Sequence, residues 1–310
     1  KRALEIAAAG GHNLLITGPP GVGKTMLAKA LNSILPPLDF QESIEVTKIY
    51  SSAGLLGEGS SIIKKRPFRA PHHTISFAGM IGGGGIPRPG EISLAHRGVL
   101  FLDEFPEFSR SVIESLRQPL EDGKVTISRS RGSVTYPSKF ILIAARNPCP
   151  CGFRNHQTRR CNCTQYELQR YNNRISGPML DRIDMHVKIG SIDVKDIVRN
   201  HQQKTPLKSS LEIKQRIIDA RKIQRQRYFN IAVNTNSEVN TRHLSKYCII
   251  NSRPQNVLNQ LKERFDLSMR VHFNLIRTAQ TIADLKSQKS IFEADILEAV
   301  QYRTETKVTK

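Results

Sequence analysis

The sequence contains no tryptophan, only 6% aromatic residues, and 27 acidic residues against 47 lysines and arginines. It also lacks any apolar run near the roughly 20 residues that a membrane-spanning helix requires, so no membrane partner is expected. No signal peptide is evident, and the expected location is therefore cytoplasmic. The chain begins Lys-Arg-Ala-Leu without an initiating methionine, and we expect a fragment of a longer protein.

The shortage of acidic residues leaves a net charge of +20. Such an excess favours a polyanionic partner, and nucleic acid is the first candidate. An anionic membrane surface is a weaker alternative, because no strongly amphipathic basic helix is evident. Compositional bias without any such partner is a third explanation. A chain of 310 residues is long enough for a sizeable core and for two domains.

A glycine-rich run from Gly18 to Thr25 fits the pattern G-x-x-x-x-G-K-[ST]. An apolar strand-like segment precedes it, and a helix-like segment follows and stops at two prolines. This arrangement aims backbone N–H groups and the positive end of a helix dipole at a phosphate. Lys24 is expected to reach the β- and γ-phosphates of ATP, and the Thr25 hydroxyl to hold Mg²⁺. The alternative, a plain glycine-rich turn, leaves the Lys-Thr pair unexplained. The residues expected to contact the nucleotide are Gly18, Pro19, Pro20, Gly21, Val22, Gly23, Lys24, Thr25 and Met26.

Two carboxylates, Asp103 and Glu104, end an apolar run that begins at Val99. A continuous apolar run of this length indicates a strand buried on both faces of a parallel sheet. Acids at its carboxyl end lie where open α/β sheets bind ligands. We expect Asp103 to hold Mg²⁺ and Glu104 to polarise the attacking water. A surface turn with two solvated acids is the alternative.

Residues 1–200 alternate strand-like and helix-like segments, which predicts an α/β domain with a parallel sheet. A polar linker is expected at 201–210, followed by a helical region at 211–310. The expected strands are Asn13–Thr17, Ser43–Lys48, Val99–Asp103, Phe140–Arg146 and Asp184–Ile189. The expected helices are Met26–Leu35, Ser109–Leu120, Thr164–Asn172, Leu211–Tyr228, Thr241–Tyr247, Pro254–Phe265, Ser268–Lys286 and Glu293–Thr304.

Two insertions interrupt the α/β half of the chain. The first, at about 51–90, is rich in glycine and carries a basic run. The second, at about 123–138, alternates apolar and polar residues on either side of Ser130-Arg131-Gly132, which predicts a β-hairpin. Arg129 and Arg131 near its tip suit contact with DNA phosphates. A merely solvated hairpin tip is the alternative.

Four of the five cysteines lie within one short loop, at 149–163. Their pattern is C-x-C, nine residues, C-x-C, and four thiolates are able to surround one Zn²⁺ tetrahedrally. Free or redox-active thiols and disulfides are the rival explanations. His156 in the loop is a possible substitute ligand, Cys248 is expected in a core, and His72-His73 are not expected to bind metal. The expected zinc ligands are Cys149, Cys151, Cys161 and Cys163.

The combination of the glycine loop and Asp103-Glu104 resembles an AAA+ ATPase. Longer phrases resemble the bacterial ComM (YifB) family, a magnesium-chelatase-like group. These phrases are RPFRAPHH from residue 66, PGEISLAH from residue 89, SGPMLDRID from residue 176 and RTAQTIADL from residue 277. The resemblance covers nearly the whole chain. It implies an AAA+ P-loop core with β-hairpin insertions and a C-terminal α-helical lid.

The resemblance also implies roles for three further residues. Asn147 matches the polar residue called sensor 1, which contacts the γ-phosphate or the attacking water; a turn-forming asparagine before a proline is the rival explanation. Arg182 matches the arginine finger that a neighbouring subunit supplies, with Arg174 as a nearby candidate. Arg270 matches the sensor 2 arginine of the lid. A surface salt bridge is the rival explanation for each arginine.

The resemblance implies an ATP- and Mg²⁺-dependent DNA motor, a helicase or branch-migration enzyme. It would form a homo-oligomeric ring, usually a hexamer, on single-stranded or branched DNA. Its role would be to extend the joint between incoming single-stranded DNA and the chromosome in natural transformation. A magnesium-chelatase-type motor that remodels a protein partner is the alternative. A nucleotide-gated scaffold with negligible turnover is a third possibility.

Overall fold

The computed structural model describes residues 1–57, 62–85, 87–129, 132–154, 156, 158–190, 209–231 and 233–303. Most of the expected linker at 201–210 therefore lies outside the described residues, as do Ser130 and Arg131. For Arg129 the backbone is described and the side chain is not. No helix in the described ranges is both long and apolar enough to cross a membrane.

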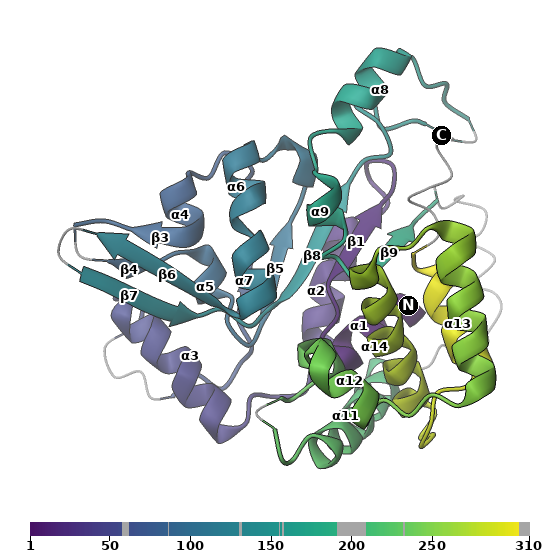
Figure 1. Cartoon of the computed structure of the whole chain (residues 1–310). Helices are drawn as coiled ribbons and strands as arrows, with labels where there is room; N and C mark the ends of the chain where they lie inside the picture. The colour runs from purple at the N-terminus through teal and green to yellow at the C-terminus, as the bar shows by residue number, and fades with distance from the viewer. Residues whose placement is uncertain are drawn as a thin grey trace.

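The α/β half is built on one sheet of five parallel strands in the order β2-β5-β8-β1-β9 (Figure 1). Because the strands are parallel, the loops after β1, β5 and β8 meet at one edge of the sheet, where such sheets bind ligands. The strands are β1 (Leu14–Thr17), β2 (Phe68–Arg69), β5 (Val99–Leu102), β8 (Ile141–Arg146) and β9 (Met185–Lys188).

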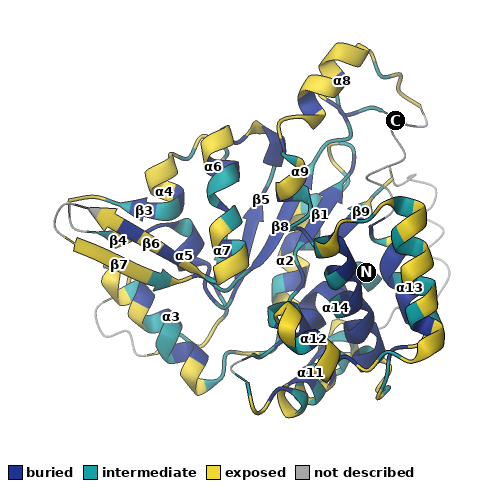
Figure 2. Cartoon of the chain, viewed as in Figure 1, coloured by how far each residue is buried: buried dark blue, intermediate teal, exposed yellow. Residues whose placement is uncertain are grey.

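Alternate residues of the strands enter two cores, one on each face of the sheet. On β1, Leu14 and Ile16 belong to one core and Leu15 to the other. On β5, Phe101 and Leu102 divide in the same way. The period-two alternation of a strand thus buries both faces, which explains why these segments read as continuous apolar runs. Figure 2 shows the central strands as buried along their length.

The prediction of a strand at Ser43–Lys48 is wrong, because the segment lies inside α3 (Phe40–Ser52). Asp39 and Glu42 form a capping box that starts this helix, since the Asp39 side chain accepts from the Glu42 N–H and the Glu42 side chain accepts from the Asp39 N–H. The fifth strand is instead the two-residue β2, within the stretch assigned to the first insertion. The other four expected strands are confirmed to within a residue.

The helix expected at Ser109–Leu120 is two helices, α6 (Arg110–Ser115) and α7 (Arg117–Asp122). Pro119 has no N–H to donate to the carbonyl of Ser115, so the helical hydrogen-bond ladder breaks between them. Both helices lie on the sheet face that carries the second core. The remaining helical elements of this half are α1 (Arg2–Gly10), α2 (Lys24–Ile34), α5 (Glu91–Leu94), η1 (Phe105–Glu107), α8 (Gln165–Asn172) and α9 (Gly177–Leu180).

The two insertions pack against each other and project from one end of the molecule (Figure 1). The first contains α4 (Phe77–Ile81), β3 (Gly82–Gly83) and β4 (Arg88–Pro89). The second is the predicted hairpin, β6 (Lys124–Arg129) with β7 (Gly132–Pro137). A Cβ on Gly82 would lie 2.6 Å from Cδ1 of Ile127, and the Tyr136 hydroxyl donates to the Pro87 carbonyl at 3.0 Å.

The C-terminal region is helical, as expected, and α14 is its centre. Leu275, Ala279 and Ile282 of α14 are buried in the core that lies on the α1 and α2 side of the sheet. The helical region therefore shares a core with the sheet. Cys248 is also buried there, as expected. The helices are α11 (Ser210–Arg227), η2 (Asn236–Glu238), α12 (Thr241–Tyr247), α13 (Ser252–Phe265), α14 (Met269–Leu285) and α15 (Glu293–Gln301).

Candidate nucleotide site and cysteine cluster

Lys24 lies at the carboxyl edge of the sheet, at the first position of α2. Its ammonium donates to the carbonyls of Gly18 at 2.8 Å and Pro19 at 3.0 Å, and to the side-chain oxygen of Asn147 at 2.9 Å. Burial lowers the pKa of Lys24, and the nearby carboxylates of Asp103 and Glu104 oppose that shift. The cation is thus held by three neutral oxygens, all of which a phosphate is able to replace.

The loop before α2 needs glycine at two positions because the backbone there is left-handed. Gly21 has φ of 80° and Gly23 has φ of 82°, a conformation that other residues adopt at a cost. This turn brings the chain directly into α2, so the free N–H groups of the first helical turn face the loop. Met26, which was expected to contact the nucleotide, lies in that first turn with an exposed side chain.

Thr25 and Asp103 come together across neighbouring loops of the same edge. The Thr25 hydroxyl donates to one carboxylate oxygen of Asp103 at 3.0 Å, and the other oxygen accepts from the Glu104 N–H at 2.9 Å. A hydroxyl and a carboxylate are oxygen donors of the kind that Mg²⁺ prefers. The donor set therefore fits a magnesium ion shared by Thr25 and Asp103.

Glu104 has a left-handed backbone conformation, with φ of 50°. Its side chain is 55% exposed, and one oxygen lies 3.2 Å from Nδ1 of His73. The rings of His72 and His73 lie with their centroids 4.1 Å apart and are tilted by 35° to each other. Spacing gave no sign of this pair; only the pairing of β2 with β5 brings the segment after β2 to Glu104.

The three arginines with expected roles form their ion pairs with other residues. Arg182 and Arg270 both pair with Glu121, at 2.6 Å and 2.8 Å. Arg174 pairs with Glu107 and donates to the Pro106 carbonyl at 3.3 Å. Within the described part of the chain, these bonds anchor each arginine to residues other than those of the glycine loop and Asp103.

Arg182 and Arg270 line a cavity of about 690 Å³ at the opposite edge of the sheet from the glycine loop. Its walls include Asn13 ahead of β1, Gly98 ahead of β5 and Ile141 at the start of β8. These are the amino ends of strands whose carboxyl ends carry the glycine loop, Asp103 and Asn147. The two groups of expected site residues therefore occupy different faces of one chain.

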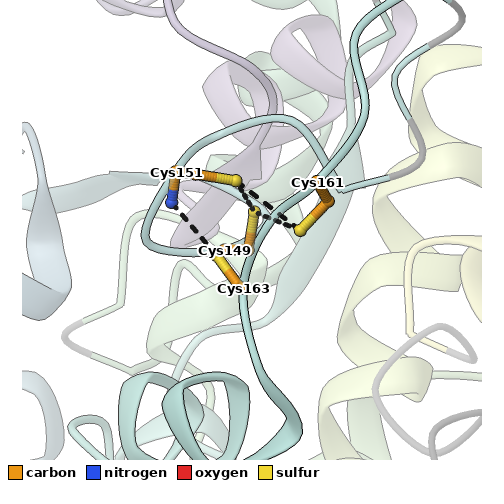
Figure 3. A group of neighbouring side chains, drawn as sticks. All are labelled: Cys149, Cys151, Cys161 and Cys163. Carbon is orange, nitrogen blue, oxygen red and sulfur yellow. Dashed lines mark hydrogen bonds between the residues drawn. The ribbon is translucent and has the colours of Figure 1, made fainter.

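The four clustered cysteines bring their sulfurs together at one point (Figure 3). All four sulfurs lie within 4.8 Å of one another. The Cys149 sulfur lies 3.3 Å from that of Cys151 and 3.7 Å from that of Cys161, and Cys151 and Cys161 are 3.5 Å apart. Tetrahedral zinc with bonds of about 2.3 Å requires sulfur separations of about 3.8 Å, close to these values. All five cysteines are free, so the donor set fits a metal better than disulfides.

The cysteine loop lies directly against the nucleotide edge. Cys149 follows Asn147 by two residues, and a Cβ on Gly152 would lie 2.7 Å from Cδ of Pro20 in the glycine loop. The Tyr171 hydroxyl of α8 donates to the Asn147 carbonyl at 3.3 Å. His156 accepts from the Thr158 and Arg159 N–H groups and is not part of the sulfur cluster.

Comparisons with known proteins cover nearly the whole chain. Residues 1–197 match the family model described as magnesium chelatase, subunit ChlI, and residues 207–303 match that of the ChlI C-terminal region. The chain is 44% identical over 306 residues to the uncharacterized protein YifB of Salmonella typhimurium, covering 98% of this chain and 58% of the relative. It is 42% identical over 308 residues to the competence protein ComM of Haemophilus influenzae, with the same coverage of 98% and 58%.

A more distant match is the magnesium-chelatase 67 kDa subunit of Heliobacterium mobile, which is 27% identical over 220 residues, or 62% of this chain and 30% of the relative. The chain thus spans 58% of the length of its YifB and ComM relatives. Both halves of the fold and both family models lead to the same assignment. The chain belongs to the magnesium-chelatase ChlI family of AAA+ proteins, in the group that includes YifB and ComM.

Proposed function

We propose that this chain is the motor portion of an ATP-dependent DNA helicase or branch-migration enzyme. The observation that carries the proposal is the convergence of Lys24, Thr25, Asp103 and Asn147 at one sheet edge, on the loops after three neighbouring strands. Each of the four presents a polar atom that suits a nucleoside triphosphate or its metal. Family membership implies ATPase activity.

In this proposal Lys24 leaves its three neutral oxygens and binds the β- and γ-phosphates of ATP. Asn147, freed from Lys24, orients the attacking water or the γ-phosphate. Thr25 and Asp103 would hold a magnesium ion, which would supply positive charge against the phosphates. Glu104, at the rim of the site, accepts the proton of the water as a general base. Arg182 acts on the ATP of a neighbouring copy, because it lies on the opposite face of its own chain.

A ring of copies follows from this division of the site between two faces. An interface between two different faces is head-to-tail, and such interfaces form a ring when the rotation between copies closes. We propose a homo-oligomeric ring, with six copies as in AAA+ rings generally. DNA would pass through it, in contact with Arg129 and Arg131 of the hairpin. The charge of +20 supports a nucleic-acid track. The competence protein ComM at 42% identity supports a role in natural transformation.

We also propose that Cys149, Cys151, Cys161 and Cys163 hold one structural zinc ion. The loop that carries them has little apolar material, and a metal would provide the cross-link that a core does not. Burial raises the pKa of the Cys149 thiol. A magnesium-chelatase-type motor acting on a protein partner is the second candidate, favoured by the match to the Heliobacterium subunit.

Steady-state ATP hydrolysis tests the proposal, measured without DNA, with single-stranded DNA and with forked DNA, each at two salt concentrations. A DNA motor whose contacts are mainly to phosphates is stimulated by DNA, and the stimulation weakens as salt rises. Lys24→Ala provides the inactive control. Hydrolysis that DNA leaves unchanged would favour the protein-remodelling candidate.

A further inference from the structure

Glu121 holds two arginines that come from distant parts of the chain. One carboxylate oxygen accepts from Arg182 at 2.6 Å and the other accepts from Arg270 at 2.8 Å. Arg182 lies in the loop before β9, and Arg270 lies in the first turn of α14. Hydrogen bonds from Arg270 and then Arg182 lower the pKa of Glu121, so the carboxylate is charged at neutral pH.

We infer that Glu121 is a positioning residue for the arginines that act on a neighbour's ATP, and that it links their movement to the β6–β7 hairpin. This inference rests on the proposed function. With no nucleotide in the neighbouring copy, Glu121 occupies both guanidinium groups. When ATP is bound there, its terminal phosphate competes for the same groups, and Glu121 is released.

The exposure of the three side chains suits such an exchange. Glu121 is 47% exposed and Arg270 is 37% exposed, and both line the open cavity at this edge. Arg182 is only 13% exposed and keeps a second hydrogen bond, to the Pro178 carbonyl at 2.9 Å. Its Nε is buried with no hydrogen-bond partner in the part of the chain that the structure describes. Arg182 therefore keeps one anchor, the Pro178 carbonyl, after Glu121 leaves.

The difference in negative charge favours binding of the two guanidinium groups to phosphate over binding to Glu121. A guanidinium binds carboxylate and phosphate with the same fork of N–H donors. The terminal phosphate of ATP carries more negative charge than one carboxylate, and it offers three oxygens to two arginines. Glu121 is thus a counter-ion strong enough to hold the pair in the empty ring and weak enough to yield to the nucleotide.

Glu121 also lies only three residues before the hairpin in the sequence. It is the next-to-last residue of α7, whose end at Asp122 is followed by Gly123 and then by β6. The Ser138 N–H donates to the Gly123 carbonyl at 2.8 Å and closes the base of the hairpin. α7 is a short helix separated from α6 at Leu116, and in this inference it moves as one unit. Release of Glu121 therefore changes the angle at which the hairpin leaves the sheet.

The test compares Glu121→Gln with the unmodified chain. A neutral amide cannot hold two guanidinium groups, so hydrolysis without DNA is expected to rise at least about threefold, and the ratio of DNA-stimulated to DNA-free rates to fall. Glu121→Asp, which keeps the charge, is expected to lie closer to the unmodified rates. Glu114→Gln is the matched control, because Glu114 pairs with Arg117 at 2.8 Å on the same pair of helices. Equal melting temperatures would exclude a folding effect.

The absence of tryptophan supplies a second readout. Val134→Trp on β7, made together with Glu104→Gln to retain ATP, gives a single indole on the hairpin. ATP is expected to change its emission when Glu121 is present and to leave it unchanged in Glu121→Gln. The inference fails if Glu121→Gln hydrolyses ATP without DNA at the unmodified rate while Arg182→Ala is inactive. Lack of DNA stimulation in the unmodified chain would instead count against the DNA motor, and the DNA-free rates would still test Glu121.

Discussion

The side-chain oxygen of Asn147 accepts a hydrogen bond of 2.9 Å from the ammonium of Lys24. The two residues lie 123 positions apart, on the loops after β8 and β1, which are neighbours in the sheet. The bond keeps both side chains at the place where a triphosphate would sit, before any nucleotide arrives. In the proposed mechanism, the phosphates of ATP replace Asn147 as the partner of Lys24.

Replacing Asn147 by alanine is expected to slow ATP hydrolysis strongly and to change ATP affinity little. Removing one preorganised hydrogen-bonding group from a reacting site costs about 10²–10³ in turnover. Binding depends mainly on Lys24 and the loop, which the change leaves in place. The measurement is kcat together with the Kd of a fluorescent ATP analogue, with the exposed Asn172→Ala as control. An unaltered kcat would remove Asn147 from the mechanism.

Replacing Glu104 by glutamine is expected to trap ATP and to stabilise rings. The amide retains the size of the side chain and loses the basic oxygen that takes a proton from water. Gel filtration with ATP measures the assembly, and radiolabelled nucleotide measures what is bound. A nucleotide-gated scaffold predicts little change in either quantity. Normal hydrolysis in this variant would show that Glu104 is not the base.

Replacing Cys161 by serine, or treating the protein with a strong chelator, is expected to remove the bound zinc and to slow ATP hydrolysis. The reason is the contact between the cysteine loop and the nucleotide edge, where Gly152 abuts Pro20. Metal content by mass spectrometry gives about one zinc per chain before treatment and none afterwards. Cys248→Ala should keep the metal, since Cys248 lies in the helical region. A protein purified with no zinc would contradict the assignment.

Stability is expected to fall as the pH drops below about 6.5 because of His186. Burial, with Arg303 nearby, lowers the pKa of His186 from 6.5 to about 3. A folded-state pKa below the unfolded value means that the unfolded chain binds the proton first. The stabilisation is therefore complete above pH 6.5 and is lost toward pH 3, at about 1.4 kcal/mol per pH unit. Urea unfolding between pH 7 and 5 measures the slope.

The structural reason is the hydrogen bond that the neutral ring accepts from Arg303 at 3.1 Å, which a protonated ring cannot accept. His186→Gln is the matched variant. The slope of its free energy of unfolding against pH should be smaller by the equivalent of about one bound proton. Other buried histidines, such as His96, are present in both proteins and cancel in the difference. Identical slopes would show that His186 does not titrate on unfolding.

Replacing Arg129 and Arg131 together by alanine is expected to weaken DNA stimulation of the ATPase. For each DNA phosphate that the variant no longer neutralises, the slope of log affinity against log salt should become shallower by about one. The measurement is the DNA concentration for half-maximal stimulation at several salt concentrations. Arg253→Ala, an exposed arginine on α13, is the control. An equal salt slope in the double variant would place the DNA contacts elsewhere.

Local patterns predicted most of the parallel sheet and the helical region, because each depends on residues near in sequence. The glycine loop and the strand ending at Asp103 are of this kind. Two local features were still misjudged. The β-branched residues in α3 favoured a strand, while the capping box of Asp39 and Glu42 favoured the helix that forms. The two-residue β2 is too short to give any periodic signal.

Sequence patterns do not predict contacts between segments that are distant in the chain. The pairing of His73 with Glu104 requires the order of strands in the sheet. The sharing of Glu121 by Arg182 and Arg270 requires the docking of α14, because Arg270 lies 149 residues beyond Glu121. The break between α6 and α7, in contrast, has a local signal in the sequence. Pro119 lies ten residues into the expected helix, and a proline at that position indicates a break.

The contact of Ile127 with Gly82 makes the two insertions a single mechanical part. An isolated two-stranded hairpin is flexible and at best marginally stable in water. Here Gly82 of β3 lies against Ile127, Val125 and Ile127 are buried, and the Tyr136 hydroxyl donates to the Pro87 carbonyl. A force applied near the hairpin tip is therefore carried into the body of the domain instead of being absorbed by bending. The projection behaves as a braced arm, and a small rotation at its base becomes a larger displacement at its end.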